Sequence, residues 1–342
     1  MAGATVALLT NAGGAHLDAY LTGLADTADV ESVVVADPSG ALEAAAKSVL
    51  KTKLKSFERD HGRALSEFKP QLALVSTEAL QAPPVIQLAL EANCHVLAEK
   101  PSCVRAEDFA PLVRLAETKH RHLMLALGNR LRGTVQQARK LIHSGQIGQL
   151  YGVEMHIIAD QTRLTKPSYQ KSWFADRARA GGGHLMWLGI HWVDLVMYLT
   201  GAKVTEATGF TGIVGGQPLK AEDSAAMVVR FDNGAFGTIT SGYYLDKGYH
   251  SHIKIWGSHG WIQLEPHGGA PLQWYSTKEP SPKVQQYDGP ADKASYTPLV
   301  AACVKAALGT AEPPITSVES LRALQTVFTC YRAAESGRVE KV

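Results

Sequence analysis

The sequence predicts an α/β protein of two domains: an N-terminal, doubly wound parallel domain and a C-terminal α+β domain with a large, open, mainly antiparallel sheet. In the first third of the chain, short apolar runs alternate with helical patterns, and strands that alternate with helices pair in parallel through right-handed crossovers. After Gly128, strand signals follow one another without helices between them, which is typical of an antiparallel sheet. We therefore place the domains at residues 1–128 and 129–342.

The first domain contains five short apolar runs that are typical of buried parallel strands. Between them, apolar side chains recur at helical spacing, as at Leu17, Leu21 and Leu24. The prolines at 83–84 are compatible with a helix because they fall in its first turn. We expect strands at residues 5–9, 30–36, 72–76, 95–98 and 122–127, and mostly helical structure at 16–25, 40–65, 83–92 and 106–118.

The second domain begins with a predicted helix and strand and continues with a long helix and a series of strands. The sequence Asp232-Asn233-Gly234 predicts a hairpin turn between two of these strands, because such residues accept the positive φ that tight turns require. A proline-rich loop at 279–298 separates the sheet from two terminal helices. We expect helices at residues 134–144 and 184–199, and strands at 152–158, 225–231, 235–243, 250–256 and 261–264.

Composition excludes several classes of protein. The 34 basic and 32 acidic residues nearly balance, whereas a protein that binds nucleic acid through phosphates usually carries a basic excess. No apolar stretch reaches the roughly 18 residues of a membrane span, and the N-terminus lacks the pattern of a secretory signal. The four cysteines form no CxxC pair, so we predict no metal site and expect a cytoplasmic protein.

The turn after the first predicted strand carries an incomplete dinucleotide signal. Of the G-x-G-x-x-G pattern only Gly13 is in place, and Thr10 stands where backbone should approach a pyrophosphate. The pair Gly13-Gly14 has a second explanation, which is close packing of a helix on the sheet. Asp37 ends the second strand, where an acidic side chain binds a ribose 2′-hydroxyl and repels a 2′-phosphate. Asp37 could equally cap the next helix.

Two longer segments are more specific. Residues 95–101 read HVLAEKP, a strand that ends in Glu-Lys-Pro, and residues 181–194 read GGGHLMWLGIHWVD. Together with shorter matches at 144–148, 222–223, 230–234 and 256–260, they resemble the Gfo/Idh/MocA family of glucose–fructose oxidoreductase and inositol dehydrogenase type, over nearly the whole chain. The resemblance implies a Rossmann-type domain followed by a domain for substrate binding and oligomerisation.

The resemblance also implies a function and a set of site residues. We expect an NAD(P)-dependent oxidoreductase, with NAD favoured over NADP, that acts on a secondary hydroxyl of a sugar, cyclitol or related polyol and forms a homo-oligomer, a dimer or tetramer. We expect no nucleic-acid or membrane partner. Lys100 and His191 take the catalytic positions of the family. The expected cofactor contacts are Thr10, Asn11, Gly13, Gly14, Asp37, Thr77, Glu99 and Lys100.

The chemistry suits these residue types. Oxidation of a secondary alcohol needs a group that takes the hydroxyl proton, and Lys100 lies at the carboxyl end of a parallel strand, where a nicotinamide would lie. His184 and His191 are seven residues apart, which places them near one face of an α-helix, so we add His184 to the catalytic candidates. The candidate substrate contacts are Trp187, Lys171, Trp173 and Tyr243.

The sequence departs from the family pattern at several positions. Trp187 stands where an aspartate is usual, Glu78-Ala79 replaces the usual Pro-Asn after Thr77, and Ala82 replaces a histidine. An indole cannot accept a proton as a carboxylate does, and its flat face could stack on a sugar or simply fill the core. Two alternatives therefore stay open: a redox-neutral, NAD-dependent enzyme that modifies or cleaves glycosides, and a non-catalytic family member that lacks the cofactor.

Overall fold

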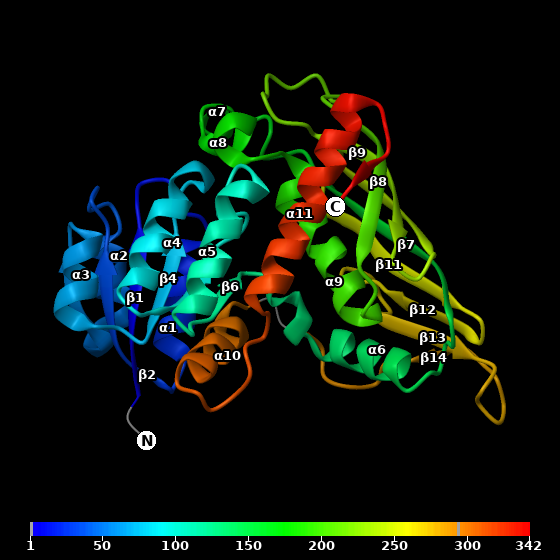
Figure 1. Ribbon diagram of the computed structural model, residues 1–342, viewed down its shortest axis with the longest axis horizontal. Coiled ribbons are helices and arrows are strands. Elements are labelled where there is room, and N and C mark those ends of the chain that lie inside the picture. Colours follow the sequence, from blue (N-terminus) through cyan, green and yellow to red (C-terminus); the bar gives the residue numbers. More distant parts are fainter. Residues whose placement is uncertain (1–2, 293–294) are drawn as a thin grey trace. The chain divides into compact units, whose positions relative to one another are not determined.

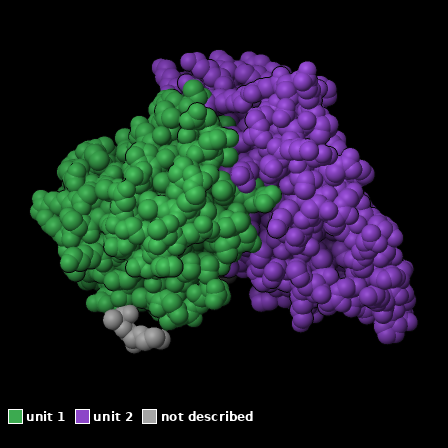
Figure 2. All heavy atoms as spheres, viewed as in Figure 1, with its two compact units in different colours: residues 1–128, 178–181, 293–322 green, residues 129–177, 182–292, 323–342 purple. Residues whose placement is uncertain are grey.

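The computed structural model describes residues 3–292 and 295–342, which form two compact units (Figure 2). Unit 1 contains the first 128 residues together with two later segments, 178–181 and 293–322. Unit 2 contains residues 129–177, 182–292 and 323–342. The chain thus returns to unit 1 twice after residue 128. The predicted division into residues 1–128 and 129–342 does not include these two returns.

Unit 1 is built on a parallel sheet with the strand order β3-β2-β1-β4-β5-β6 (Figure 1). The apolar runs of the sequence form its central strands, and every residue of β4 is buried. The predicted doubly wound α/β architecture is therefore confirmed for the described residues. The strands are β1 (Ala4–Thr10), β2 (Val30–Ala36), β3 (Leu54–Glu58), β4 (Leu72–Ser76), β5 (His95–Ala98) and β6 (Leu123–Leu125).

The helices of unit 1 form two packed groups, as expected of a doubly wound sheet. Helix α1 contacts α2 and α10, whereas α4 contacts α3 and α5. Helix α10 comes from the returning segment 293–322, so that segment completes the layer that α1 and α2 begin. The bounds are α1 (Leu17–Asp26), α2 (Glu43–Leu50), α3 (His61–Phe68), α4 (Ala82–Glu91), α5 (Ala106–Thr118) and α10 (Thr297–Ala307).

One prediction in this unit is wrong. Residues 40–65 were expected to be mostly helical, but Leu54–Glu58 forms the edge strand β3 between α2 and α3. The sequence LKSFE has no continuous apolar run, because an edge strand pairs on one side only and tolerates lysine and serine. Its pairing with β2, rather than its own pattern, makes it a strand.

Unit 2 is built on a mixed, mainly antiparallel sheet with the order β14-β13-β12-β11-β7-β10-β9-β8-β15. Strands β7 and β10 pair in parallel, and the other recorded pairs are antiparallel. The strands are β7 (Leu150–Asp160), β8 (Val204–Gly212), β9 (Ser224–Phe231), β10 (Phe236–Leu245), β11 (Tyr249–Gly257), β12 (Gly260–Leu264), β13 (Leu272–Ser276), β14 (Gln285–Gln286) and β15 (Glu340–Lys341).

The sequence predicted the inner strands of this sheet and missed those nearer its edges. Strand β9 alternates buried and exposed residues, which is the pattern of a half-buried strand. Strand β8, with the sequence VTEATGFTG, has few buried positions, and β14 and β15 are two residues long. Such strands are defined by their neighbours more than by local pattern.

The helices of unit 2 pack on the sheet at one face (Figure 1). Helix α6 (Gly133–His143) contacts α9 and β12, and α9 (Ile190–Thr200) contacts β7. The predicted helix at 184–199 is interrupted, because Leu185–Gly189 forms a π-helical turn before α9 begins. Helix α11 (Ser317–Ser336) starts in unit 1 and ends in unit 2.

Candidate active site

Four of the predicted cofactor residues lie at the carboxyl edge of the parallel sheet. Thr10 ends β1, Asp37 follows β2, Thr77 follows β4 and Glu99 follows β5. Thr10 pairs directly with Ser76 at the end of β4, which is the point where the strand order reverses. Open α/β sheets bind ligands outside this edge, at the reversal point.

The Thr10 hydroxyl faces the sheet. It donates a hydrogen bond of 2.7 Å to the backbone oxygen of Ser76, and the residue is fully buried. A Cβ atom at Gly14 would lie 2.2 Å from that hydroxyl oxygen, so Gly14 is the counterpart that makes room for threonine. The Asn11 side-chain oxygen accepts from the Gly13 N–H at 2.9 Å and closes the turn. The replacement of glycine by Thr10 therefore changes the inner packing of the turn.

The N-terminus of α1 follows this turn. Its N-cap residue, His16, has a left-handed backbone with φ of 57° and provides no side-chain cap. The N–H groups in the first turn of a helix have no intrahelical partners, and with the helix dipole they favour an anion. The end of β1, the glycine turn and this helix start together fit a pyrophosphate.

Asp37 is held by the loop that follows it. One carboxylate oxygen accepts from the Ser39 N–H (2.9 Å) and hydroxyl (2.7 Å), and the other accepts from the Leu42 N–H at 3.0 Å. Burial acts to raise the pKa of Asp37, but these donors outweigh it, and the pKa lies below its ordinary value. Asp37 thus caps the start of the next helical segment and also keeps a negative charge at the end of β2.

Glu99 and Lys100 are both buried at the end of β5, each 4% exposed. The Tyr20 hydroxyl donates to Glu99 Oε2, whereas Oε1 has no hydrogen-bond partner among the described residues. Burial raises the pKa of Glu99 to about 7, although Lys100 and Tyr20 act to lower it. A buried acceptor oxygen without a protein partner fits a hydroxyl or amide group of a bound cofactor.

The departure at Glu78 has a structural explanation. Glu78 is 5% exposed, and its two carboxylate oxygens accept from Arg179 Nε (2.7 Å) and Nη2 (2.6 Å). Arg179 belongs to the segment 178–181, which directly precedes the glycine run at 181–183. This bidentate ion pair fixes the segment 178–181 on unit 1. Glu78 therefore has a structural role that the sequence pattern does not reveal.

His184 is fully buried in unit 2. Its Nδ1 lies 2.6 Å from the Ser241 hydroxyl, and its ring meets the Tyr243 ring edge-on, with centroids 4.3 Å apart. Burial lowers the pKa of His184 to about 3, so the imidazole is neutral at physiological pH. Its Nε2 has no hydrogen-bond partner among the described residues.

The glycine run before His184 packs against a buried carboxylate. Glu222 accepts from the N–H groups of Gly183 (2.6 Å) and Leu185 (3.0 Å) and from the Tyr331 hydroxyl (2.8 Å). A Cβ atom at Gly183 would lie 1.8 Å from the Glu222 backbone oxygen, and one at Gly182 would lie 2.1 Å from the Tyr331 hydroxyl. The glycines are therefore required within unit 2 itself, to let the chain reach Glu222 and Tyr331.

The expectation that His184 and His191 share an α-helical face does not hold. The π-helical turn Leu185–Gly189 lies between them, and the 3.6-residue period does not apply across it. His184 is completely enclosed, whereas His191 lies in the first turn of α9 and is partly exposed. The two histidines therefore occupy different environments.

The remaining substrate candidates are mostly buried. Trp187 and Trp173 are 6% and 5% exposed and pack on Phe174, with ring centroids 4.6 and 4.1 Å from it. Tyr243 is 4% exposed, and Lys171 is exposed at the end of the short helix α7 (Pro167–Gln170). The two indoles thus form one aromatic cluster with Phe174.

Sequence reasoning missed the residues that hold these groups in place. Ser241, Tyr331 and Glu222 are distant in sequence from the segment 183–186 that they position, and each resembles an ordinary strand, helix or loop residue. Glu222 did give a signal, because the pair Glu222-Asp223 matched the family pattern. The pair Glu78–Arg179 gave none, since its partners are 101 residues apart.

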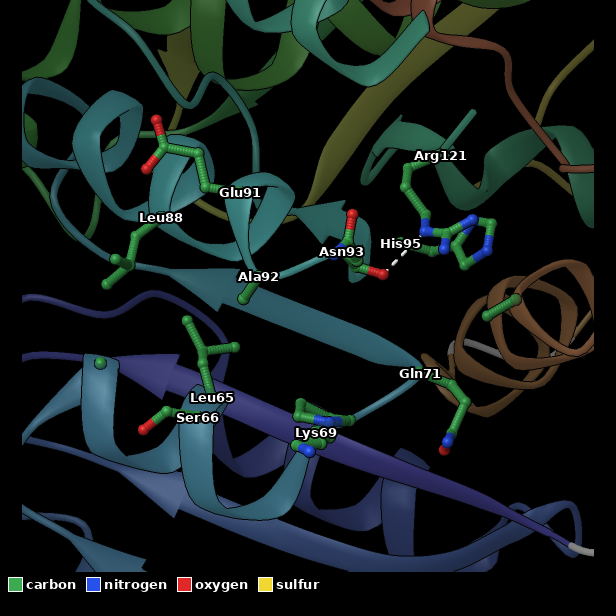
Figure 3. Close-up of a pocket in the computed structure, with 13 residues that line it drawn as sticks. Leu65, Ser66, Lys69, Gln71, Leu88, Glu91, Ala92, Asn93, His95 and Arg121 are labelled. Atoms are coloured by element: carbon green, nitrogen blue, oxygen red, sulfur yellow. Dashed lines mark hydrogen bonds between the residues drawn. The ribbon is translucent and has the colours of Figure 1, made fainter. Parts of the chain in front are cut away.

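A cavity of about 890 Å³ lies at the opposite, amino end of the parallel strands (Figure 3). Gln71 and His95 line it just before or at the start of β4 and β5. Arg121 Nε donates to the Asn93 backbone oxygen at 2.7 Å on its wall. None of the predicted site residues lines this cavity.

Two further properties of the described residues bear on function. No three histidine, cysteine, aspartate or glutamate side chains in 3–292 and 295–342 gather in a way that could hold a metal ion. Over the same residues, none of the helices combines the length and apolar character that crossing a membrane requires.

Comparison with known proteins gives the family. A model described as "Oxidoreductase family, NAD-binding Rossmann fold" matches residues 9–127, and one described as "GFO/IDH/MocA C-terminal domain" matches residues 135–263. The myo-inositol 2-dehydrogenase of Thermotoga maritima is 27% identical over 177 residues, which are 50% of this chain and 49% of that protein. The D-xylose 1-dehydrogenase (NADP(+)) of Haloarcula marismortui is 25% identical over 244 residues, 70% of this chain and 66% of that protein.

An uncharacterised oxidoreductase of Schizosaccharomyces pombe is 29% identical over 49% of this chain and 44% of its own, so the chain spans about half the length of several curated relatives. Among solved structures, an oxidoreductase domain protein from Kribbella flavida matches with a TM-score of 0.87 at 21% identity over 100% of both chains. A levoglucosan dehydrogenase in complex with NADH matches with a TM-score of 0.86 at 19% identity over 99% of both chains. By its two matching domains and its fold, the chain belongs to the Gfo/Idh/MocA family of NAD-binding oxidoreductases.

Proposed function

We propose that the protein is an NAD-dependent dehydrogenase that oxidises a secondary hydroxyl of a sugar, cyclitol or related polyol. The observation that carries this proposal is the buried pair Glu99–Lys100 at the carboxyl end of β5, with one glutamate oxygen that no described residue satisfies. Relatives that include a D-xylose and a myo-inositol dehydrogenase support the substrate class.

When bound, the nicotinamide supplies the hydride acceptor, and the chain supplies the proton chemistry and the positioning. Lys100 takes the proton of the substrate hydroxyl as a neutral amine, or polarises the carbonyl that forms as an ammonium, because the residue directly follows Glu99 at the carboxyl end of β5, where the site is expected. Glu99 Oε1 would accept a hydrogen bond from the cofactor. We assign the second proton-handling or hydroxyl-binding role to His191, which is partly exposed.

We propose NAD rather than NADP because Asp37 remains ionised. Its carboxylate stays charged through hydrogen bonds from Ser39 and Leu42, and a fixed negative charge at the end of β2 disfavours a 2′-phosphate. The buried Thr10 hydroxyl supports cofactor binding, because it donates to the Ser76 backbone oxygen and is accommodated against Gly14 within the turn.

We propose that a second copy of the chain covers the open face of the nine-stranded sheet. Four large apolar side chains lie exposed on that face: Phe210 (80%), Phe236 (52%), Val228 (44%) and Trp256 (36%). The pairing registers place all four on one side of β8 to β11. Monomeric proteins rarely leave such a patch open, and a homodimer would bury it.

The test begins with the purified protein, titrated with NAD and with NADP and followed by calorimetry. Sugars and cyclitols are then screened for reduced nicotinamide by absorbance. We expect NAD to bind at least 10-fold more tightly than NADP and at least one polyol to reduce it. Failure of both dinucleotides to bind near a millimolar concentration would rule out the proposal. Light scattering of the wild type and of Phe210→Ser tests the dimer, which the variant should weaken.

A further inference from the structure

An arginine that forms no ion pair with any described residue lies near His184. Arg163 follows the end of β7, and its guanidinium carbon lies 5.7 Å from the centroid of the Tyr243 ring. That ring in turn contacts His184, with centroids 4.3 Å apart. The charge of Arg163 also acts to lower the pKa of His184, so the guanidinium lies within electrostatic range of that imidazole.

Three tyrosines lie in the neighbourhood of Arg163. Its guanidinium lies over the Tyr243 ring, and Tyr169 and Tyr249 pack against the small cluster to which Tyr243 belongs. Tyr249 is fixed by stacking on His267, with centroids 4.5 Å apart. The partly exposed phenols of Tyr169 and Tyr249 provide hydrogen-bond donors and acceptors near one positive charge.

Nearby carboxylates do not neutralise this charge. Asp160 is close enough to interact electrostatically, but it forms no ion pair with Arg163, and its carboxylate accepts from the N–H and hydroxyl of Thr162. Glu222 is buried and bound by Gly183, Leu185 and Tyr331. No salt bridge to Arg163 is present among the described residues, and the side chain is exposed. The arginine can therefore meet an anion from solution without breaking an existing pair.

This cluster is continuous with the helix start that carries His184. A small core of Ala159, Leu164 and Tyr243 holds the base of the loop, and Tyr169, Tyr249 and Leu188 pack against it. Leu188 belongs to the π-helical turn that follows His184. The loop that bears Arg163 and the segment that bears His184 thus form one wall within unit 2.

We propose that Arg163, with Tyr169 and Tyr249, binds a carboxylate of the substrate, so that the preferred substrate is an acidic sugar such as a uronic acid. This inference rests on the proposed function, since it names the substrate of that same site. The planar guanidinium matches a carboxylate in two parallel hydrogen bonds, and phenolic hydroxyls can donate to the same oxygens. A single guanidinium among uncharged phenols matches one negative charge better than the two of a phosphate ester.

The test measures binding first, without reliance on turnover. Calorimetry compares glucuronate with glucose and galacturonate with galactose, in the absence and presence of NADH, with glucose 6-phosphate as the phosphate arm. We expect at least one acid to bind 10-fold or more tightly than its neutral partner. Arg163→Gln should weaken binding of that acid about 10- to 100-fold and leave the neutral sugar unchanged. Arg163→Lys should recover part of the loss.

The matched control is Arg338→Gln, which removes an exposed arginine from the same unit. Equal affinity for every acid and its neutral partner, or an unchanged affinity in Arg163→Gln, would show that the guanidinium only covers the Tyr243 ring. Preference for the phosphate over both acids would likewise overturn the carboxylate assignment. An acid that binds through Arg163 but never reduces NAD or NADP would leave this inference standing and refute the proposed dehydrogenase.

Discussion

The substitution Tyr331→Phe tests how the segment 183–186 is held. The Tyr331 hydroxyl donates to Glu222 at 2.8 Å and accepts from the Met186 N–H at 3.1 Å, and all three groups are buried. Its removal leaves the buried Met186 N–H without a partner, which lowers the free energy of unfolding by about 1–3 kcal/mol. It also takes one of three hydrogen-bond donors from the Glu222 carboxylate, which lowers it by about 1.5–3 kcal/mol. Because the two losses share one hydroxyl, we expect the free energy of unfolding to fall by about 2–4 kcal/mol.

Chemical denaturation of the wild type and the variant measures this loss, with Tyr275→Phe as the control. Tyr275 is partly buried on β13, and no side-chain hydrogen bond of its hydroxyl is present among the described residues. Its substitution should change the free energy of unfolding by less than about 0.5 kcal/mol. An equal loss in the two variants would show that the Tyr331 hydroxyl contributes nothing specific.

The loss should also depend on pH. Burial raises the pKa of Glu222 to about 7, and the Tyr331 hydroxyl acts to lower it, so Tyr331→Phe raises this pKa further. Between the unfolded value near 4.5 and the folded value, the folded chain binds more protons, so stability falls as pH rises through that window. In the variant the folded pKa of Glu222 is higher, so the pH range over which stability falls extends to higher pH. The difference in unfolding free energy should therefore be larger at pH 8 than at pH 6, and a smaller difference at pH 8 would refute the reasoning.

Three other outcomes follow from the structure. Gly183→Ala should destabilise the protein more than Gly182→Ala, by thermal unfolding, because its new Cβ meets a backbone oxygen rather than a side-chain hydroxyl. Lys100→Met should lower kcat by about 10²- to 10⁴-fold while the Kd for NADH, from calorimetry, changes only a few-fold, since the loss lies in proton transfer. Glu78→Ala should lower the free energy of unfolding, measured by chemical denaturation, by about 1–2 kcal/mol, because the half-exposed Arg179 can be hydrated again. A loss as large as that of Tyr331→Phe would contradict this.

The sequence predicts the parts of the fold that have their own local pattern. Strand β4 begins with a run of four apolar residues, and β9 ends directly before the turn signal Asp232-Asn233-Gly234, so both were recognisable. Strands β3 and β8 were not, because an edge strand is defined by pairing with a distant neighbour. The π-helical turn Leu185–Gly189 was also beyond reach, since its sequence is apolar throughout and equally compatible with an α-helix.

The candidate site divides in the same way. Thr10 ends a strand, and Asp37 and Glu99 follow strands, so parallel pairing alone brings them to one edge of the sheet. The direction of each side chain did not follow from the sequence. The inward Thr10 hydroxyl and the capped Asp37 carboxylate depend on backbone atoms of Ser76 and Leu42, whose placement only the folded chain determines.

The return of residues 293–322 to unit 1 determines whether the N-terminal domain can be produced as a separate fragment. Ser317 and Ser320, at the start of α11, accept hydrogen bonds of 3.1 Å from the N–H groups of Leu123 and Leu125 along the outer edge of β6. A fragment that stops at residue 128 would leave those N–H groups without their serine acceptors. It would also expose the surface of α1 that α10 covers. Exposed strand edges template aggregation, so the cofactor-binding half of this protein is not separable by a single cut.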